Sequence, residues 1–254
     1  FKSVKSLSAK KTTLSSLSKA INLFLLINNS SNCFFSEFIS SIQHAFLMLV
    51  YWSSDKSFNL KPKLSTSFFL IFGLIIFGFG EGLLILSTTG NSPWSVLAEG
   101  ISKNSKLSIG AATFLVSVSV LLLWIFLKQK PGLGTIFNII IISAMIDITL
   151  YFFDAPSSVW SKYLLSILSV MLVGIGSGIY LVANLGPGPR DGLMTGLTKI
   201  TNLPIALVRA CLEISVVIVG WYLGGTVGVG TLIFAFGIGP CVAFGLFIVN
   251  KSFS

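Results

Sequence analysis

The stretch that decides the fold reads GFGEGLLILSTTGNSPWSVLAEG at residues 78–100, and it recurs as GIGSGIYLVANLGPGPRDGLMTG at residues 174–196. Both copies end on a similar tetrapeptide, GLGT at 132–135 and GVGT at 228–231, so the copies stay 96 residues apart (174 − 78) without a gap. Of the 58 aligned pairs, 16 are identical, whereas similar composition alone would give roughly five. The sequence therefore predicts a duplicated unit.

The composition is that of a membrane protein. Hydrophobic residues make up 54% of the 254 residues and charged residues only 10%, against about 25% charged residues in soluble domains. Six apolar segments are long enough to cross a bilayer core: 68–86, 110–127, 134–153, 163–183, 204–223 and 231–249. A large soluble protein with buried helices would need a polar shell that this composition does not supply. We expect a polytopic α-helical membrane protein.

The placement of basic residues predicts the orientation. Counted from residue 61, seven would lie on one side of the membrane (Lys61, Lys63, Lys128, Lys130, Arg190, Lys199 and Lys251) and three on the other (Lys103, Lys106 and Lys162). The excess favours a multi-pass protein with both termini in the cytoplasm. The net charge of +9 is thus mainly a topology signal. No basic surface interleaved with aromatic residues suggests a nucleic-acid partner, and the expected partner is the lipid bilayer.

Each copy of the repeat contains three spans. Because three is odd, the second copy must enter the membrane inverted relative to the first. The predicted fold is an all-α membrane protein with six transmembrane helices as an inverted 3+3 repeat, with repeat 1 over residues 66–160 and repeat 2 over 161–254. Inverted repeats build many secondary transporters, with a substrate site near the midplane between the halves. A duplicated dual-topology ancestor that transports nothing would leave the same pattern.

Residues 1–65 differ from the rest in composition, being rich in Ser, Lys, Asn and Phe. Their apolar runs at 20–27 and 45–52 are too short to span a bilayer. We expect a disordered or surface-associated extension, in which residues 34–52 would suit an amphipathic interfacial helix. Because the chain starts at Phe1, Met48 is a candidate alternative start, and whether residues 1–47 belong to the native protein stays open.

Residues 183–196, the pair Arg209 and Glu213, and residues 220–231 together resemble the YczE-like bacterial integral membrane proteins, which are grouped loosely with YitT-type proteins. The resemblance covers roughly residues 65–250. It implies a multi-span bacterial plasma-membrane protein and carries no settled biochemical activity. Ser95 stands where the pattern of that family has Asp, which weakens any symmetric role of the two loops.

The glycine triplets at 78, 80, 82 and at 174, 176, 178 lie inside hydrophobic spans. Dinucleotide-binding glycines need a strand, a turn and a helix in water, which this context does not provide. Small residues at this spacing let transmembrane helices approach closely. We therefore favour helix packing, with an unwound substrate-binding segment as the alternative.

Residues 189–191, Pro-Arg-Asp, predict a helix start, and Pro93 begins the equivalent helix in the first copy. The free N–H groups of a helix start, together with Arg190, would suit a carboxylate or phosphate ligand. We therefore include Pro189, Arg190, Asp191 and the nearby Asn184 among the candidate substrate-binding residues. An ordinary connecting helix at the cytoplasmic surface is the favoured alternative. Hydrogen bonds between helices would explain Asn184 and Asn138 equally well.

Four ionisable residues fall within the apolar spans: Glu81, Asp147, Arg209 and Glu213. An unpaired charge there costs at least about 2.5–3.5 kcal/mol, so each must pair, face water or become neutral. Arg209 and Glu213 are four residues apart and can pair on one helix face. Glu81, Arg209 and Glu213 are candidates for a substrate site, and Asp147 for a coupling or a structural charge. A static ion-pair cluster explains the four residues equally well.

No residue pattern indicates an enzyme, a metal site or a cofactor. Cys33, Cys211 and Cys241 have no paired spacing, and His44 is the only histidine. We expect translocation of a small solute, anionic or amphiphilic, through a site between the two repeats. The alternative is a non-transporting membrane scaffold or regulatory protein. Homo-oligomerisation stays open.

Overall fold

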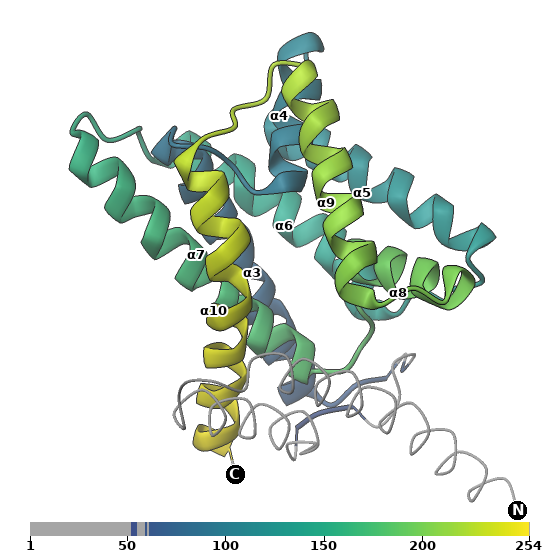
Figure 1. The fold of residues 1–254 in the computed structure, drawn as a ribbon. Helices are drawn as coiled ribbons and strands as arrows, with labels where there is room; N and C mark the ends of the chain where they lie inside the picture. Colours follow the sequence, from purple (N-terminus) through teal and green to yellow (C-terminus); the bar gives the residue numbers. More distant parts are fainter. Residues whose placement is uncertain (1–51, 55–58, 60, 254) are drawn as a thin grey trace, which may run out of the picture. The chain divides into compact units, whose positions relative to one another are not determined.

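The computed structural model describes residues 52–54, 59 and 61–253, which form eight helices and no strand (Figure 1). The helices are α3 (Leu64–Ser87), α4 (Pro93–Asn104), α5 (Ile109–Phe126), α6 (Leu133–Phe152), α7 (Val159–Val182), α8 (Pro189–Thr201), α9 (Ile205–Tyr222) and α10 (Val229–Phe253). The expected amphipathic helix at 34–52 lies, apart from Trp52, outside the described residues, as does the candidate start at Met48.

Six of these helices, α3, α5, α6, α7, α9 and α10, are long and apolar enough to cross a membrane. They coincide within a few residues with the six predicted spans, which confirms a membrane protein with multiple apolar helices. The other two, α4 and α8, are only 12 and 13 residues long. Each begins at the proline predicted as a helix start, because proline lacks the N–H that a first helical position leaves unused.

The helix starts are evenly spaced along the chain. Helices α4, α5 and α6 begin at residues 93, 109 and 133, and α8, α9 and α10 begin at 189, 205 and 229. Each pair of starts is 96 residues apart (189 − 93, 205 − 109 and 229 − 133). The turns before the short helices match as well, since Gly90 and Gly186 both have positive φ, 128° and 117°.

Helices α3 and α7 cross at the middle glycine of each triplet. A Cβ on Gly80 would lie 2.9 Å from Val173, and a Cβ on Gly176 would lie 2.6 Å from the backbone nitrogen of Phe77. The outer glycines of the triplets lie against α6 and α10: Gly78 and Gly82 against α6, and Gly174 and Gly178 against α10. Both triplets sit within unbroken helices. The glycines therefore serve close packing, and neither triplet is an unwound segment.

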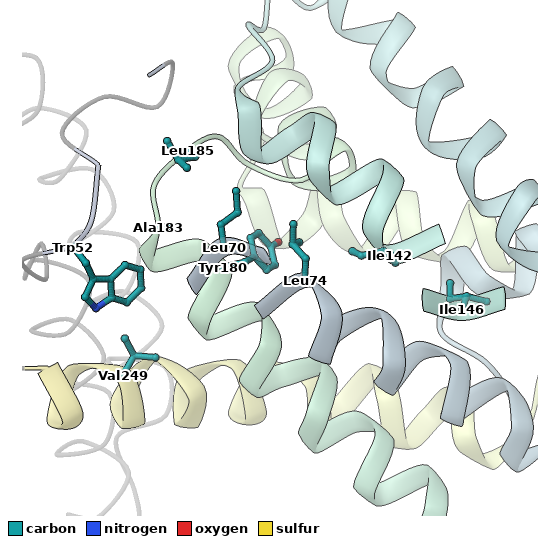
Figure 2. Close-up of a cluster of buried hydrophobic side chains, with 9 residues drawn as sticks. All are labelled: Trp52, Leu70, Leu74, Ile142, Ile146, Tyr180, Ala183, Leu185 and Val249. Atoms are coloured by element: carbon teal, nitrogen blue, oxygen red, sulfur yellow. The ribbon is translucent and has the colours of Figure 1, made fainter. Parts of the chain in front are cut away.

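The largest buried cluster lies around the start of α3 and the end of α7 (Figure 2). Trp52 is fully buried there and stacks on Phe69 with ring centroids 4.4 Å apart. The Ser54 N–H donates to the Ala183 carbonyl at 3.1 Å. Residues 52–54, which the composition assigns to the N-terminal extension, are thus part of the packed membrane unit.

The pair of helices α5 and α6 packs differently from the pair α9 and α10. Helix α5 packs along α6, where Gly110 lies against Ser143 and Asp147. Helix α9 does not pack along α10 in the same way; Figure 1 shows them as separate rods joined by the loop at 223–228. A Cβ added to Gly239 of α10 would meet no described atom within 4 Å.

The glycine at the α3–α7 crossing should be intolerant of a methyl group. We expect Gly176→Ala to lower the thermal unfolding temperature of the detergent-purified protein, because the backbone of Phe77 must move; overpacking of this kind costs about 1–3 kcal/mol. Gly239→Ala is the matched control and should leave the unfolding temperature unchanged or slightly higher. Equal unfolding temperatures for the two variants would contradict this account of the crossing.

Candidate functional site

A cavity of about 170 Å³ lies among the helices, and each of the eight described helices contributes to its lining. Its charged groups come from α8 and α9: Arg190 and Asp191 from the first turn of α8, and Arg209 and Glu213 from α9. Apolar side chains from α3, α6, α7 and α10 form another part of the lining: Phe77, Ile142, Val173, Phe234, Ile238 and Val242. The cavity is therefore amphiphilic.

Arg190 enters the cavity from the second position of α8. Its guanidinium carbon lies 5.5 Å from the ring centroid of Trp94, a cation–π distance. Its Nη1 lies 3.9 Å from Glu81 Oε1, which is an ion pair but too long for a hydrogen bond. Burial lowers the pKa of the Arg190 guanidinium from its ordinary value, and the negative charges of Glu81 and Asp191 oppose this.

Glu81 lies behind Arg190 and is fully buried. Its Oε2 accepts hydrogen bonds from the hydroxyls of Ser92 and Ser95 at 2.7 and 2.6 Å, both at the start of α4. Its Oε1 has no hydrogen-bond donor among the described residues. Glu81 is thus next to the cavity rather than part of its lining, and it connects α3, α4 and α8.

Asp191 is held by Tyr180 of α7, whose hydroxyl donates to Asp191 Oδ2 at 3.0 Å. Burial raises the pKa of the Asp191 carboxyl, whereas the hydrogen bond from Tyr180 and the charges of Arg209 and Arg190 act in the opposite direction. Asp191 therefore lies near two cations and is hydrogen-bonded to one phenol.

The predicted pair on α9 is confirmed. Arg209 Nε donates to Glu213 Oε1 at 2.9 Å, one helical turn apart. The Arg209 side chain is 47% exposed although it lines the cavity, while that of Glu213 is 21% exposed. The cavity therefore opens to the outside beside α9.

Two candidate residues lie away from the cavity. Asn184 follows α7 with a positive φ of 52°, and its amide donates to the Ser54 carbonyl at 2.8 Å. Asp147 accepts hydrogen bonds from the Ser108 hydroxyl and the Gly110 N–H at 2.6 and 2.7 Å, which fixes the start of α5 against α6. Neither side chain is part of the cavity lining. Of the remaining candidates, Pro189, Arg190, Asp191, Arg209 and Glu213 line the cavity and Glu81 adjoins it.

Three residues in or near the site were not singled out from the sequence. Tyr180 and Trp94 line the cavity, but an aromatic residue in an apolar run carries no signal of this role. Glu99 binds Thr226 N, Thr226 Oγ1, Asn91 Nδ2 and Lys103 Nζ at 2.7–2.8 Å, and so joins the loop before α4 to the loop before α10. The spacing of Glu99 and Lys103, four residues, is the one readable signal. Within the described part of the chain, no cluster of His, Cys, Asp and Glu could hold a metal ion.

Comparison with known proteins gives a family match over residues 64–246, to the family described as "Family of unknown function (DUF6198)". An uncharacterized protein of Haemophilus influenzae is 44% identical over 200 residues, which cover 79% of this chain and 91% of the relative. YczE of Bacillus subtilis, an uncharacterized membrane protein, is 31% identical over 180 residues, covering 70% of this chain and 84% of YczE. YyaS of Bacillus subtilis is 29% identical over 167 residues, covering 63% and 82%. No solved structure matches the chain significantly.

The two glutamates of the site should differ in their effect on stability. Glu81→Gln removes one of the two negative charges that act on the partly buried Arg190, and breaking a fully buried pair costs about 3–5 kcal/mol. The 21% exposure of Arg190 and the remaining charge of Asp191 place the expected loss below that range. Glu213→Gln removes a partly exposed pair within one helix, worth about 0.2–0.5 kcal/mol in isolated helices. We expect a much lower unfolding temperature for Glu81→Gln than for Glu213→Gln in detergent. The reverse order would show that the α9 pair, and not Glu81, holds the site together.

Proposed function

The chain belongs to the family of unknown function DUF6198, and we propose that it translocates a small solute across a membrane through the cavity among its helices. The observation that carries the proposal is the cavity itself. It combines four charged side chains with an apolar wall, and it is open beside α9. Ionisable residues inside a membrane protein are costly, and they commonly mark solute or ion pathways.

We further propose that the protein is an inverted 3+3 repeat, with repeat 1 over residues 66–160 and repeat 2 over 161–254. In support, the cavity lining contains residues in pairs 96 positions apart: Phe77 and Val173, Pro93 and Pro189, Trp94 and Arg190, Thr113 and Arg209, Ser117 and Glu213, and Ile142 and Ile238. A site between two inverted repeats is expected to draw such pairs from both halves.

Two backbone hydrogen bonds support the same relation. The Gly134 N–H donates to the Leu185 carbonyl at 2.8 Å, and the Gly230 N–H donates to the Thr89 carbonyl at 3.0 Å. Positions 134 and 230 are 96 apart, as are 89 and 185. Each proposed repeat therefore begins its last span with a hydrogen bond to the other, as a two-fold relation between the halves requires.

The halves differ at one contact, which suggests how transport would proceed. Ser143 of α6 packs against Gly110 of α5, but a Cβ on the equivalent Gly239 of α10 would meet no described residue within 4 Å. Alternating access moves one repeat or bundle against the other around a fixed site. We propose that α9 closes on α10 in a second state, with Ala206 meeting Gly239 as Gly110 meets Ser143.

The orientation and location belong to the same proposal. We propose a plasma-membrane location, as the resemblance to the YczE-like proteins implies, and the basic residues of the loops favour both termini in the cytoplasm. In that orientation α8 lies toward the cytoplasm and α4 toward the opposite side.

The rival function is a non-transporting scaffold, and the exposure of α9 favours it as a second candidate. Only Val208 and Gly220 of its 18 residues are buried, so a helix of a partner protein or of a second copy would have room there. In that case the Arg209–Glu213 pair would be structural.

Cross-linking tests the proposed closure without knowledge of the solute. In a variant lacking Cys33, Cys211 and Cys241, we expect Ala206→Cys with Gly239→Cys to form a disulfide in native membranes under mild oxidation. Single-cysteine variants control for links between molecules. Ser108→Cys with Asp147→Cys serves as the reference pair, because those side chains touch in the structure at 2.6 Å. A reference pair that cross-links while the α9–α10 pair does not would favour the scaffold.

A further inference from the structure

Arg190 is the one charged side chain lining the cavity to which the described residues give no hydrogen bond. Arg209 and Glu213 are bonded to each other, and Asp191 accepts from Tyr180. The nearest acceptor of Arg190, Glu81 Oε1, is 3.9 Å away, and Glu81 Oε2 is already bonded to two serine hydroxyls. A guanidinium has five N–H donors, and buried polar groups are normally hydrogen-bonded. The Arg190 side chain, 21% exposed, therefore has donors available to a ligand.

The buried indole N–H of Trp94 is a second donor that favours a hydrogen-bond acceptor on the ligand. Trp94 lines the cavity under the Arg190 guanidinium and is 5% exposed. Its indole N–H has no hydrogen-bond acceptor in the described part of the chain. Arg190 and Trp94, which line the cavity, offer donors only, whereas the unsatisfied acceptor nearby, Glu81 Oε1, lies outside the lining. The ligand group that complements the two lining residues is therefore an acceptor.

The helix starts add positive potential at the same place. Pro93 and Trp94 open α4, and Pro189 and Arg190 open α8; all four line the cavity. A helix N-terminus presents free N–H groups and a partial positive charge, which favour an anion. The side chains that line the cavity, two cationic and two anionic, have formal charges that sum to zero, and the adjoining Glu81 adds one negative charge. The hydrogen-bond donors of Arg190 and Trp94 and the two helix starts are therefore the features that favour an anion at this place.

The remaining lining residues limit the size and the polarity of the rest of the anion. The apolar side chains from α3, α6, α7 and α10 provide a wall without charge. The volume of about 170 Å³ is below the 300–1,000 Å³ typical of drug-sized ligand pockets, so it suits only a small molecule. We propose that the solute is a small organic anion whose carboxylate or phosphonate group binds Arg190, with a short apolar chain against this wall. The inference rests on the proposed function, because it names the solute class of the same cavity.

Four probes of one chain length separate the alternatives: butyrate, butylphosphonate, butyramide and butylammonium, added at matched ionic strength to the detergent-purified full chain. We expect butyrate, butylphosphonate or both to raise the unfolding temperature in a saturable way, because a ligand stabilises the state that it binds. Butyramide and butylammonium should have no such effect. Saturation by one anion and not the other identifies a carboxylate or a phosphonate site.

Arg190→Gln should weaken the apparent affinity for the anion about 10- to 100-fold, the size expected for losing hydrogen bonds to a charged group. Lys199→Gln removes the same charge from an exposed position of the same helix and should leave the affinity unchanged. If Arg190→Gln does not fold, Arg190→Lys keeps the charge without the planar fork and should show an intermediate loss.

Stabilisation by butylammonium alone would overturn the anion assignment and leave a solute site in place. Equal anion effects in wild type and Arg190→Gln would overturn it as well, since the anion would then bind elsewhere. Absence of any probe effect, together with α9–α10 cross-linking, would reject the small organic anion while supporting transport. Absence of both effects would reject the proposed function too.

Discussion

The rest of the structure depends on a backbone contact between two helices. Helices α3 and α7 approach so closely that Gly80 and Gly176 have no room for a side chain, a packing that membrane helices achieve with small residues. The flanking glycines of each triplet bring α6 and α10 against the same pair. Four spans are thereby joined at one crossing, and the remaining helices are placed around it. The cavity is bounded by this group on one part of its lining and by α4, α5, α8 and α9 on the other.

A second constraint acts on charge. Each buried or half-buried carboxylate in the spans has a polar partner. Glu81 accepts hydrogen bonds from two hydroxyls and lies near a guanidinium, and Asp147 binds the start of a helix. Glu213 pairs with an arginine one helical turn away. Such compensation is required where water is scarce. Among the charged residues that line the cavity, Arg190 alone makes no hydrogen bond to a described residue.

Much of the fold could be predicted from the sequence because it rests on local signals. Span positions follow from hydrophobic length, the starts of α4 and α8 from Pro93 and Pro189, and the Arg209–Glu213 pair from its spacing. The site was only partly predictable, because its members meet through tertiary contacts. Asn184 bonds to Ser54, a residue 130 positions away, and Tyr180 reaches Asp191 across a turn. Nothing local distinguishes Asn184 from a cavity residue, or Tyr180 from an aromatic residue of the core.

Under the proposed repeat, the contacting residues Glu81 and Arg190 are not equivalents of each other. The equivalent of Glu81 is Ser177, and the equivalent of Arg190 is Trp94. A dimer of two first halves would place each carboxylate beside a tryptophan, and a dimer of two second halves would place each guanidinium beside a serine. Either homodimer would then lack the opposite charge that the Glu81–Arg190 contact supplies. Under the proposed repeat, each half would therefore depend on the other for its ionic partner at this contact.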